Sequence, residues 1–115
     1  ELIPNSGGKG KFRGGLGQEI IIGTLTNEPY FVSAAAFERT KEGPNGREGG
    51  QRGSKGSVTI SDGRVVKDKG NYMINANETI CLRTPGGGGF GKFNQRKNEK
   101  IKADLKFGYI TKSNL

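Results

Sequence analysis

Glycine is the feature that most constrains this chain, because 21 of its 115 residues are Gly. The ordinary share in proteins is only about 7%. Most of these glycines lie in three stretches, residues 5–17, 38–56 and 85–91. Glycine adopts positive φ and lets another backbone come close. The sequence therefore predicts a chain of turns and close backbone contacts rather than thick helical layers.

Large apolar residues are scarce outside these stretches. Only 30% of the chain is hydrophobic, and Trp is absent. A single domain of this size buries about 65% of its unfolded surface. We therefore expect modest stability in isolation, and we expect the chain to pack against a neighbouring domain or chain. The sequence starts at Glu1 without a Met, as a piece of a longer chain would.

Short runs rich in β-branched and aromatic residues predict strands between the glycine stretches. The glycine-rich residues 38–56 are predicted to form a flexible loop. Ser61-Asp62-Gly63 is a hairpin signal between two of the runs. The predicted strands are residues 18–25, 30–37, 57–60, 64–67, 72–75 and 79–84.

One helix is predicted after the last glycine run. Ile101 and Leu105 are four residues apart and so share a face, Asn98 could cap the start, and Gly108 could end the helix. We predict a mainly β fold, a small sandwich or bent antiparallel sheet with Gly-rich loops and one C-terminal α-helix. It comprises a β-rich part, residues 1–91, and a basic helical tail, residues 92–115.

The net charge of +8 makes nucleic acid the first partner to consider. Residues 92–115 hold seven Lys and Arg against two Asp and Glu, and so supply +5 of that charge. A solvated helix face explains such a run better. Aromatic residues are few, with Phe12 and Phe90 alone inside basic glycine runs, and this argues against a nucleic-acid partner.

Several chemistries are excluded by composition. With no His and a single Cys, the chain has neither a Cys/His zinc site nor a Ser-His-Asp triad. No metal site and no catalytic residue is assigned within it. The chain also lacks a signal peptide and an apolar run of about 20 residues, so we expect a cytoplasmic protein without membrane contact.

The run from Pro85 to Gly91 nearly matches a nucleotide-binding P-loop. Gly86, Gly91 and Lys92 have the required spacing, but a P-loop needs a hydroxyl after the Lys to hold Mg²⁺, and Phe93 stands there. We interpret the run instead as a structural loop that bends the backbone at a strand end and admits another backbone or a partner chain. Its glycines are Gly86, Gly87, Gly88, Gly89 and Gly91.

The first glycine stretch surrounds one arginine, Arg13, with Gly14 and Gly15 directly after it. Arg-Gly-Gly occurs in disordered RNA-binding segments, but there as long repeats. Bare backbone amides around a fixed Arg can also hold a carboxylate or phosphate. Two interpretations stay open: a substrate- or anion-binding site at these three residues, or a hairpin in which Arg13 pairs with an acid such as Glu19.

Phe37-Glu38-Arg39 is a second candidate for substrate or anion binding. Adjacent side chains on a strand point to opposite faces, so either Glu38 or Arg39 can face a site while the other faces solvent. An isolated Glu-Arg pair such as Glu38-Arg39 usually has a structural role.

Two motifs resemble those of a known family. Ser6-Gly7-Gly8-x-Gly10-x-Phe12-Arg13-Gly14-Gly15-x-Gly17 is similar to a segment shared by hydantoinase B, the 5-oxoprolinase B region and the acetone carboxylase α subunit. Thr84-Pro85-Gly86-Gly87-Gly88-Gly89-Phe90-Gly91 resembles a second segment near the C-terminus of that family, in the expected order. Asp104 and Gly108-Tyr109-Ile110-Thr111 resemble the closing helical segment.

The chain departs from the family pattern before the last predicted strand and after the last glycine run. Asn77-Glu78 stands where the family usually has Gly-Asp, and Lys92-Phe93 where it has Asp-Pro. Arg96-Lys97 replaces an Arg-Asp pair. Because acids are lost, the local salt bridges are expected to differ from those of the family, while the fold is expected to stay the same.

The resemblance implies that residues 1–115 form the C-terminal domain of a longer hydantoinase B-like subunit. Such a protein is part of an ATP-dependent hydrolase that opens a small cyclic amide, a hydantoin or 5-oxoproline, or of a related carboxylase acting on a ketone. It implies a hydantoinase A-type companion subunit, with ATP and a divalent metal in the full complex and no cofactor on this segment. The segment is then inactive alone and serves packing or assembly. The alternative is a basic Gly-rich nucleic-acid-binding module.

Overall fold

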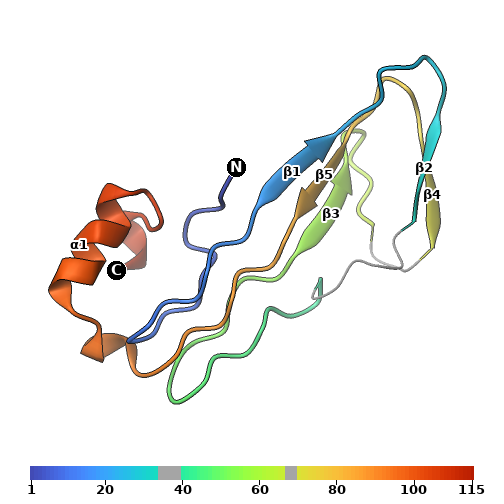
Figure 1. Cartoon of the computed structure of the whole chain (residues 1–115). Helices are drawn as coiled ribbons and strands as arrows, with labels where there is room; N and C mark the ends of the chain where they lie inside the picture. Colours follow the sequence, from blue (N-terminus) through green and yellow to red (C-terminus); the bar gives the residue numbers. More distant parts are fainter. Residues whose placement is uncertain (34–39, 67–69) are drawn as a thin grey trace.

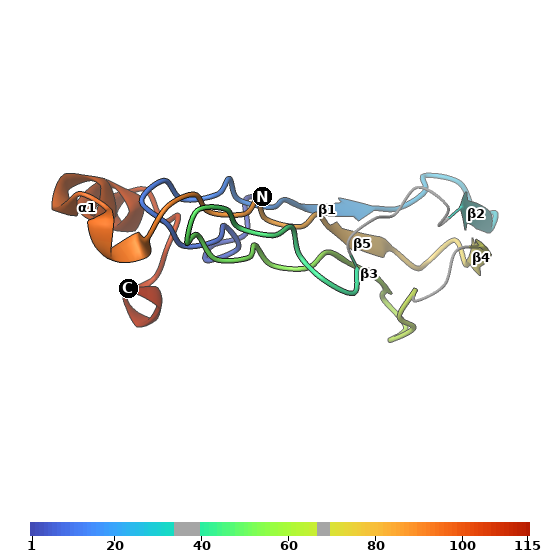
Figure 2. The same ribbon diagram turned by 90° about the horizontal axis from the view of Figure 1, so that it is seen from below.

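The computed structural model describes residues 1–33, 40–66 and 70–115. The molecule is long and flat, with extents of 52 × 26 × 17 Å. Figure 1 shows the strands toward one end, the α-helix at the other, and extended glycine segments between them; Figure 2 shows how thin the whole is. The elements are β1 (Glu19–Ile22), β2 (Tyr30–Ser33), β3 (Ser57–Ile60), β4 (Asn71–Ile74), β5 (Ile80–Arg83), α1 (Asn98–Lys106) and the short 3-10 helices η2 (Phe93–Gln95) and η3 (Lys112–Asn114).

Two antiparallel sheets form the strand end. β1, β5 and β3 make a three-stranded sheet with β5 in the centre, and β2 pairs with β4 in a two-stranded sheet. The predicted hairpin turn is confirmed at Gly63, which has φ +99° and donates its amide to the carbonyl of Ile60. Of the predicted strand 64–67, the described residues 64–66 form an isolated bridge between Thr59 and Val65, and Lys67 lies outside the described residues.

A small side-chain core lies between the two sheets. Val58 and Ile60 alternate with partly exposed residues along β3, as expected for a strand with one buried face. Ile80 is directly opposite Ile60 in the register, and Ile74 of β4 is fully buried against the same cluster. Tyr30, Val32, Tyr72 and Leu82 pack around it.

The glycine segments form a second, different core. The segment 85–91 runs through its centre, and segments 6–10, 12–17, 43–47 and 50–54 exchange backbone hydrogen bonds with it. The central segment has four neighbours: Gly86 and Gly89 donate their amides to segment 50–54, and Gly87 donates to Gly15. The carbonyls of Gly87 and Gly89 accept from Gly8 and Arg47. A strand in a flat sheet has only two neighbours, so this arrangement resembles bundled polyproline-II-like chains. We call it the glycine bundle.

Glycine is required in the bundle because backbones touch where side chains would stand. A Cβ built on Gly14 would overlap the carbonyl oxygen of Gly87, and one built on Gly88 would overlap that of Asn45. The predicted close approach at Pro85–Gly91 is thus confirmed. Among the glycines of this run, only Gly91 has a positive φ, +75°, so the left-handed turn lies at the end of the run.

The prediction of a flexible loop at residues 38–56 is wrong for its described part, residues 40–56. Gly43 and Gly50 lie against other backbones of the bundle, and Arg47 donates its amide to the carbonyl of Gly89. Sequence reasoning missed this because the residues against which the stretch packs are distant along the chain.

The predicted fold class is confirmed: the described residues form antiparallel sheets with a single α-helix. Asn98 was predicted to cap α1, but it is the first residue of the helix, and Lys97 occupies the cap position. The predicted stop is confirmed, since Gly108 follows the helix with φ +74°. No helix within the described ranges is long and apolar enough to cross a bilayer.

Candidate functional site

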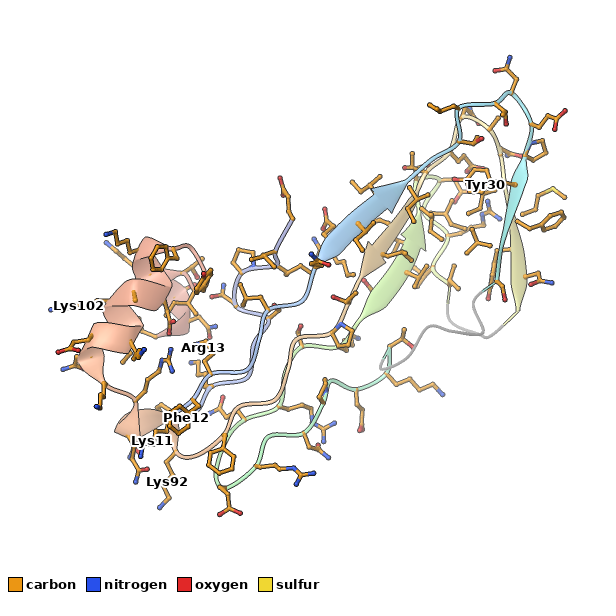
Figure 3. The ribbon with its side chains drawn as sticks, in the orientation of Figure 1. Lys11, Phe12, Arg13, Tyr30, Lys92 and Lys102 are labelled. Atoms are coloured by element: carbon orange, nitrogen blue, oxygen red, sulfur yellow. The ribbon has the colours of Figure 1, made fainter. Side chains whose placement is uncertain are left out.

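The candidate site lies where the glycine bundle meets α1. Arg13 leaves the bundle toward the helix (Figure 3), and the backbone around it is held by hydrogen bonds from Phe12 to Phe90 and from Gly14 to Gly8. The stick view also places Lys11 and Phe12 at the outer tip, away from the sheets. The bundle therefore fixes the starting position of the Arg13 side chain.

Asp104 of α1 receives this side chain. The Nε of Arg13 is 3.3 Å from Oδ2 of Asp104. Arg96 approaches the same carboxylate in a bidentate way, with Nε 2.9 Å from Oδ2 and Nη2 3.0 Å from Oδ1. The three side chains are only 9–11% exposed. We call them the Arg13–Asp104–Arg96 cluster.

The C-terminal turn of α1 positions Asp104. The backbone carbonyl of Asp104 accepts hydrogen bonds from the amides of Tyr109, at 2.9 Å, and Ile110, at 3.4 Å, after the left-handed turn at Gly108. Asn5 ties the segment beyond to the bundle, because its Oδ1 accepts the amide of Thr111 at 2.8 Å. The helix is thereby anchored on the first glycine stretch.

A pocket of about 350 Å³ opens beside the cluster. Leu2, Leu16 and Tyr109 supply apolar and aromatic wall, while the cluster supplies the charge. Gly14 and Gly15 also line it. A Cβ on Gly15 would meet nothing within 4 Å, in contrast to one on Gly14. The structure thus brings Arg13, Gly14 and Gly15, the first set of predicted binding residues, to one pocket.

Other predicted residues lie elsewhere. Glu38 and Arg39, with Phe37, fall outside the described residues. Gly86, Gly87, Gly88 and Gly89 lie inside the bundle and support the site only through backbone contacts.

The suggested pairing of Arg13 with Glu19 is wrong. Glu19 instead binds Arg83 across the β1–β5 pair, 2.7 Å from its Nε, and this hydrogen bond raises the pKa of Arg83. Sequence reasoning also missed Arg96 as a site residue. The available signal was its place eight residues before Asp104, next to a departure from the family pattern.

The outer tip of the bundle carries a small aromatic and basic surface. The rings of Phe12 and Phe90 are 6.3 Å apart and tilted, and both side chains are about half exposed. Lys11 places its Nζ 5.6 Å from the centre of the Phe12 ring, and Lys92 lies at the same tip (Figure 3). Within the described ranges, no three His, Cys, Asp or Glu side chains are grouped to hold a metal.

The sequence of the chain is similar to those of known proteins. Residues 1–93 match the hydantoinase B/oxoprolinase family. The chain is 37% identical over 93 residues to 5-oxoprolinase of Saccharomyces cerevisiae, and 33% identical over 118 residues to a D-/L-hydantoinase B-type subunit of a Pseudomonas species. These alignments cover 76% and 97% of this chain. A 5-oxoprolinase of Dictyostelium discoideum is 38% identical over 91 residues, or 76% of the chain.

The matched relatives are much longer than this chain. The alignments span 7% of each of the two 5-oxoprolinases and 19% of the Pseudomonas protein. No solved structure matches the chain significantly.

Proposed function

The chain belongs to the hydantoinase B/oxoprolinase family, and from this premise we propose that it is the C-terminal packing and assembly domain of an ATP-dependent cyclic-amide hydrolase. The small cyclic amide is a hydantoin or 5-oxoproline. ATP and a divalent metal are bound elsewhere in the full complex, which contains the remainder of this subunit and a hydantoinase A-type companion. The domain alone has no hydrolase activity.

The observation that carries this proposal is the uncovered apolar surface of β1. Ile20 and Ile22 pair with Leu82 and Ile80, and so continue the face on which the core is built, yet they are 40% and 44% exposed. Ile21, on the opposite face of the sheet, is 64% exposed. Apolar residues gathered on one strand mark an interaction site.

A second uncovered pair lies on the outer face of the β2–β4 sheet. Phe31 and Met73 are directly opposite each other and are 69% and 50% exposed. Their strand neighbours Tyr30, Val32 and Tyr72 face the core instead. A domain that spans a small fraction of its relatives and leaves apolar faces uncovered is suited to pack against a larger body.

Two measurements test the proposal. The chain alone, given ATP with 5-oxoproline or a hydantoin, should release no ADP above background. Co-expressed with the remaining part of its subunit and the companion, it should co-purify and support ADP release. An Ile20→Lys, Ile22→Lys double variant should fail to co-purify, whereas Leu115→Lys, at an exposed apolar position outside β1, should behave as wild type.

The outcomes that count against the proposal are equally concrete. Turnover by the chain alone removes the claim of inactivity. Normal co-purification of the double variant shows that β1 is not the assembly surface.

The aromatic tip favours one alternative, a nucleic-acid-binding module. Exposed Phe12 and Phe90 beside Lys11 and Lys92 could stack bases and contact phosphates. That function predicts binding to a short single strand that weakens with salt by about 0.7 log units per phosphate contact for each log unit of salt. It also predicts loss of binding in Phe12→Ala. No binding at low salt removes this alternative.

A further inference from the structure

The charge balance of the Arg13–Asp104–Arg96 cluster is incomplete. Two guanidinium groups share one carboxylate. One positive charge is therefore left without a counter-charge. Because all three side chains are about nine-tenths buried, water reaches this charge poorly. Buried charges in proteins are ordinarily paired.

The unpaired charge can be assigned to Arg13. The guanidinium of Arg96 is fully engaged, because its Nε and Nη2 bind Asp104 and its Nη1 donates to the carbonyl of Lys11 at 3.1 Å. Arg13 uses its Nε at a longer distance, 3.3 Å. Its Nη1 is buried and has no hydrogen-bond partner among the residues that the structure describes. A donor of this kind calls for an acceptor.

Arg13 itself lines the adjacent pocket, so an anion there would lie beside its excess positive charge. The volume of the pocket, about 350 Å³, lies in the range of small-ligand sites. Leu2, Leu16 and Tyr109 provide an apolar wall, and Gly15 leaves open space. The occupant should therefore combine one anionic group with a short apolar part.

We propose that this pocket is a binding site for a monocarboxylate, held by the guanidinium of Arg13 with its alkyl part against Leu2, Leu16 and Tyr109. A carboxylate matches the single excess charge and the fork of a guanidinium. A phosphate, with a charge of about −1.5 to −2 at neutral pH, would place excess negative charge beside Asp104. The carboxylate is either that of a free small molecule or that of an Asp or Glu side chain from a neighbouring chain.

The test uses the 115-residue chain with its arginines labelled at Nε and observed by NMR. Pentanoate is the free-carboxylate probe, and acetyl-Ala-Glu-Ala-amide is the side-chain probe. Pentanamide and phosphate are the controls. Pentanoate or the peptide should shift the Arg13 Nε signal in a saturable way, with Kd on the order of 1 mM. Pentanamide should leave it unchanged, and phosphate should bind more weakly.

Three variants separate binding from folding. Arg13→Gln keeps the bidentate Arg96–Asp104 pair and should weaken pentanoate binding by about tenfold or more, since a charge-assisted hydrogen bond is lost. Gly15→Val adds a side chain where nothing clashes and should also weaken binding. Arg52 is a surface arginine paired with Glu42, and their side chains are 46% and 73% exposed, respectively. Arg52→Gln should leave pentanoate binding unchanged.

The two probes also identify the source. Tighter binding of pentanoate indicates a free small carboxylate, and tighter binding of the peptide indicates a side chain of a neighbouring chain. No saturable shift with either probe, an equal shift with pentanamide, or unchanged affinity in Arg13→Gln overturns the proposal.

Discussion

The sheet end and the glycine bundle of this molecule are stabilised by opposite means. At the sheet end, Val58, Ile60, Ile74 and Ile80 fill a core with side chains. In the glycine bundle, backbones pack directly on one another, and the core consists of peptide groups joined by hydrogen bonds. The first kind of core fails when atoms are removed, and the second fails when atoms are added.

The difference also explains why the site lies where it does. Hydrogen bonds in several directions hold the bundle, so a side chain that leaves it starts from a fixed backbone. Arg13 uses this to reach Asp104, 91 residues further along the chain. The strands of the sheet end instead leave Ile20 and Ile22 uncovered, as suits a surface for assembly.

The largest expected effect is the loss of the bundle in Gly14→Ala. The added methyl group would overlap the carbonyl oxygen of Gly87, and a backbone atom inside the bundle cannot move aside. We expect destabilisation of about 4 kcal/mol or more, at the extreme of single substitutions. Urea unfolding followed by circular dichroism measures it.

Gly15→Ala is the matched control for this prediction. Its methyl group meets nothing within 4 Å, and the residue is the next one in the chain. The free energy of unfolding should stay within about 0.5 kcal/mol of wild type. Equal effects of the two substitutions would show that backbone contact does not explain the glycines.

At the sheet end, the substitution that removes atoms should be the damaging one. Ile74 is fully buried, so Ile74→Ala leaves a cavity and should cost about 3 kcal/mol, also measured by urea unfolding. Ile21→Ala, at a side chain that is 64% exposed, should change stability by less than about 0.5 kcal/mol. A neutral Ile74→Ala would show that the sheet end does not depend on its side-chain core.

The smallest effect concerns pH and the hairpin turn of the sheet end. The backbone amide of Arg64 and then its side chain lower the pKa of Asp62 below its ordinary 3.8. A carboxylate whose pKa is lower in the folded state contributes stability above its unfolded pKa and loses it as pH falls through the folded pKa. Asp62→Asn should therefore be less stable than wild type at pH 6, with the difference shrinking below pH 3.8.

Urea unfolding of both proteins from about pH 6 to about pH 2, a range that spans the titration of a carboxylate, checks this. A difference that stays constant across the range would rule out the carboxylate as its cause. Gly15→Ala, which has the same titratable groups, should follow the wild-type pH profile throughout.

The local features of the fold could be predicted from sequence. The hairpin turn before Arg64 follows from Ser61-Asp62-Gly63, and the end of α1 follows from Gly108. The glycine run at 85–91 correctly predicted a close approach of another backbone. The two turns depend on residues that are neighbours in the chain, and the close approach was indicated by the glycine content of the run, although the run did not identify the distant partner.

The long-range features could not be predicted. Residues 40–56 read as a loop because their partners in 6–10 and 85–91 are set by the tertiary fold. Glu19 is the acid nearest to Arg13 along the sequence, but Arg13 pairs with Asp104 in the folded chain. Arg96 could not be predicted for the same reason, since its contact with Asp104 depends on how α1 packs against the bundle.

The central claim is that the glycine bundle is an ordered, hydrogen-bonded core that holds the site in place. Amide hydrogen exchange of Gly87 and Gly89 tests it most directly, because these amides donate to Gly15 and Gln51 inside the bundle. We expect both to exchange as slowly as the paired amides of β5. Exchange at the rate of an unstructured peptide, with β5 still protected, would contradict the claim.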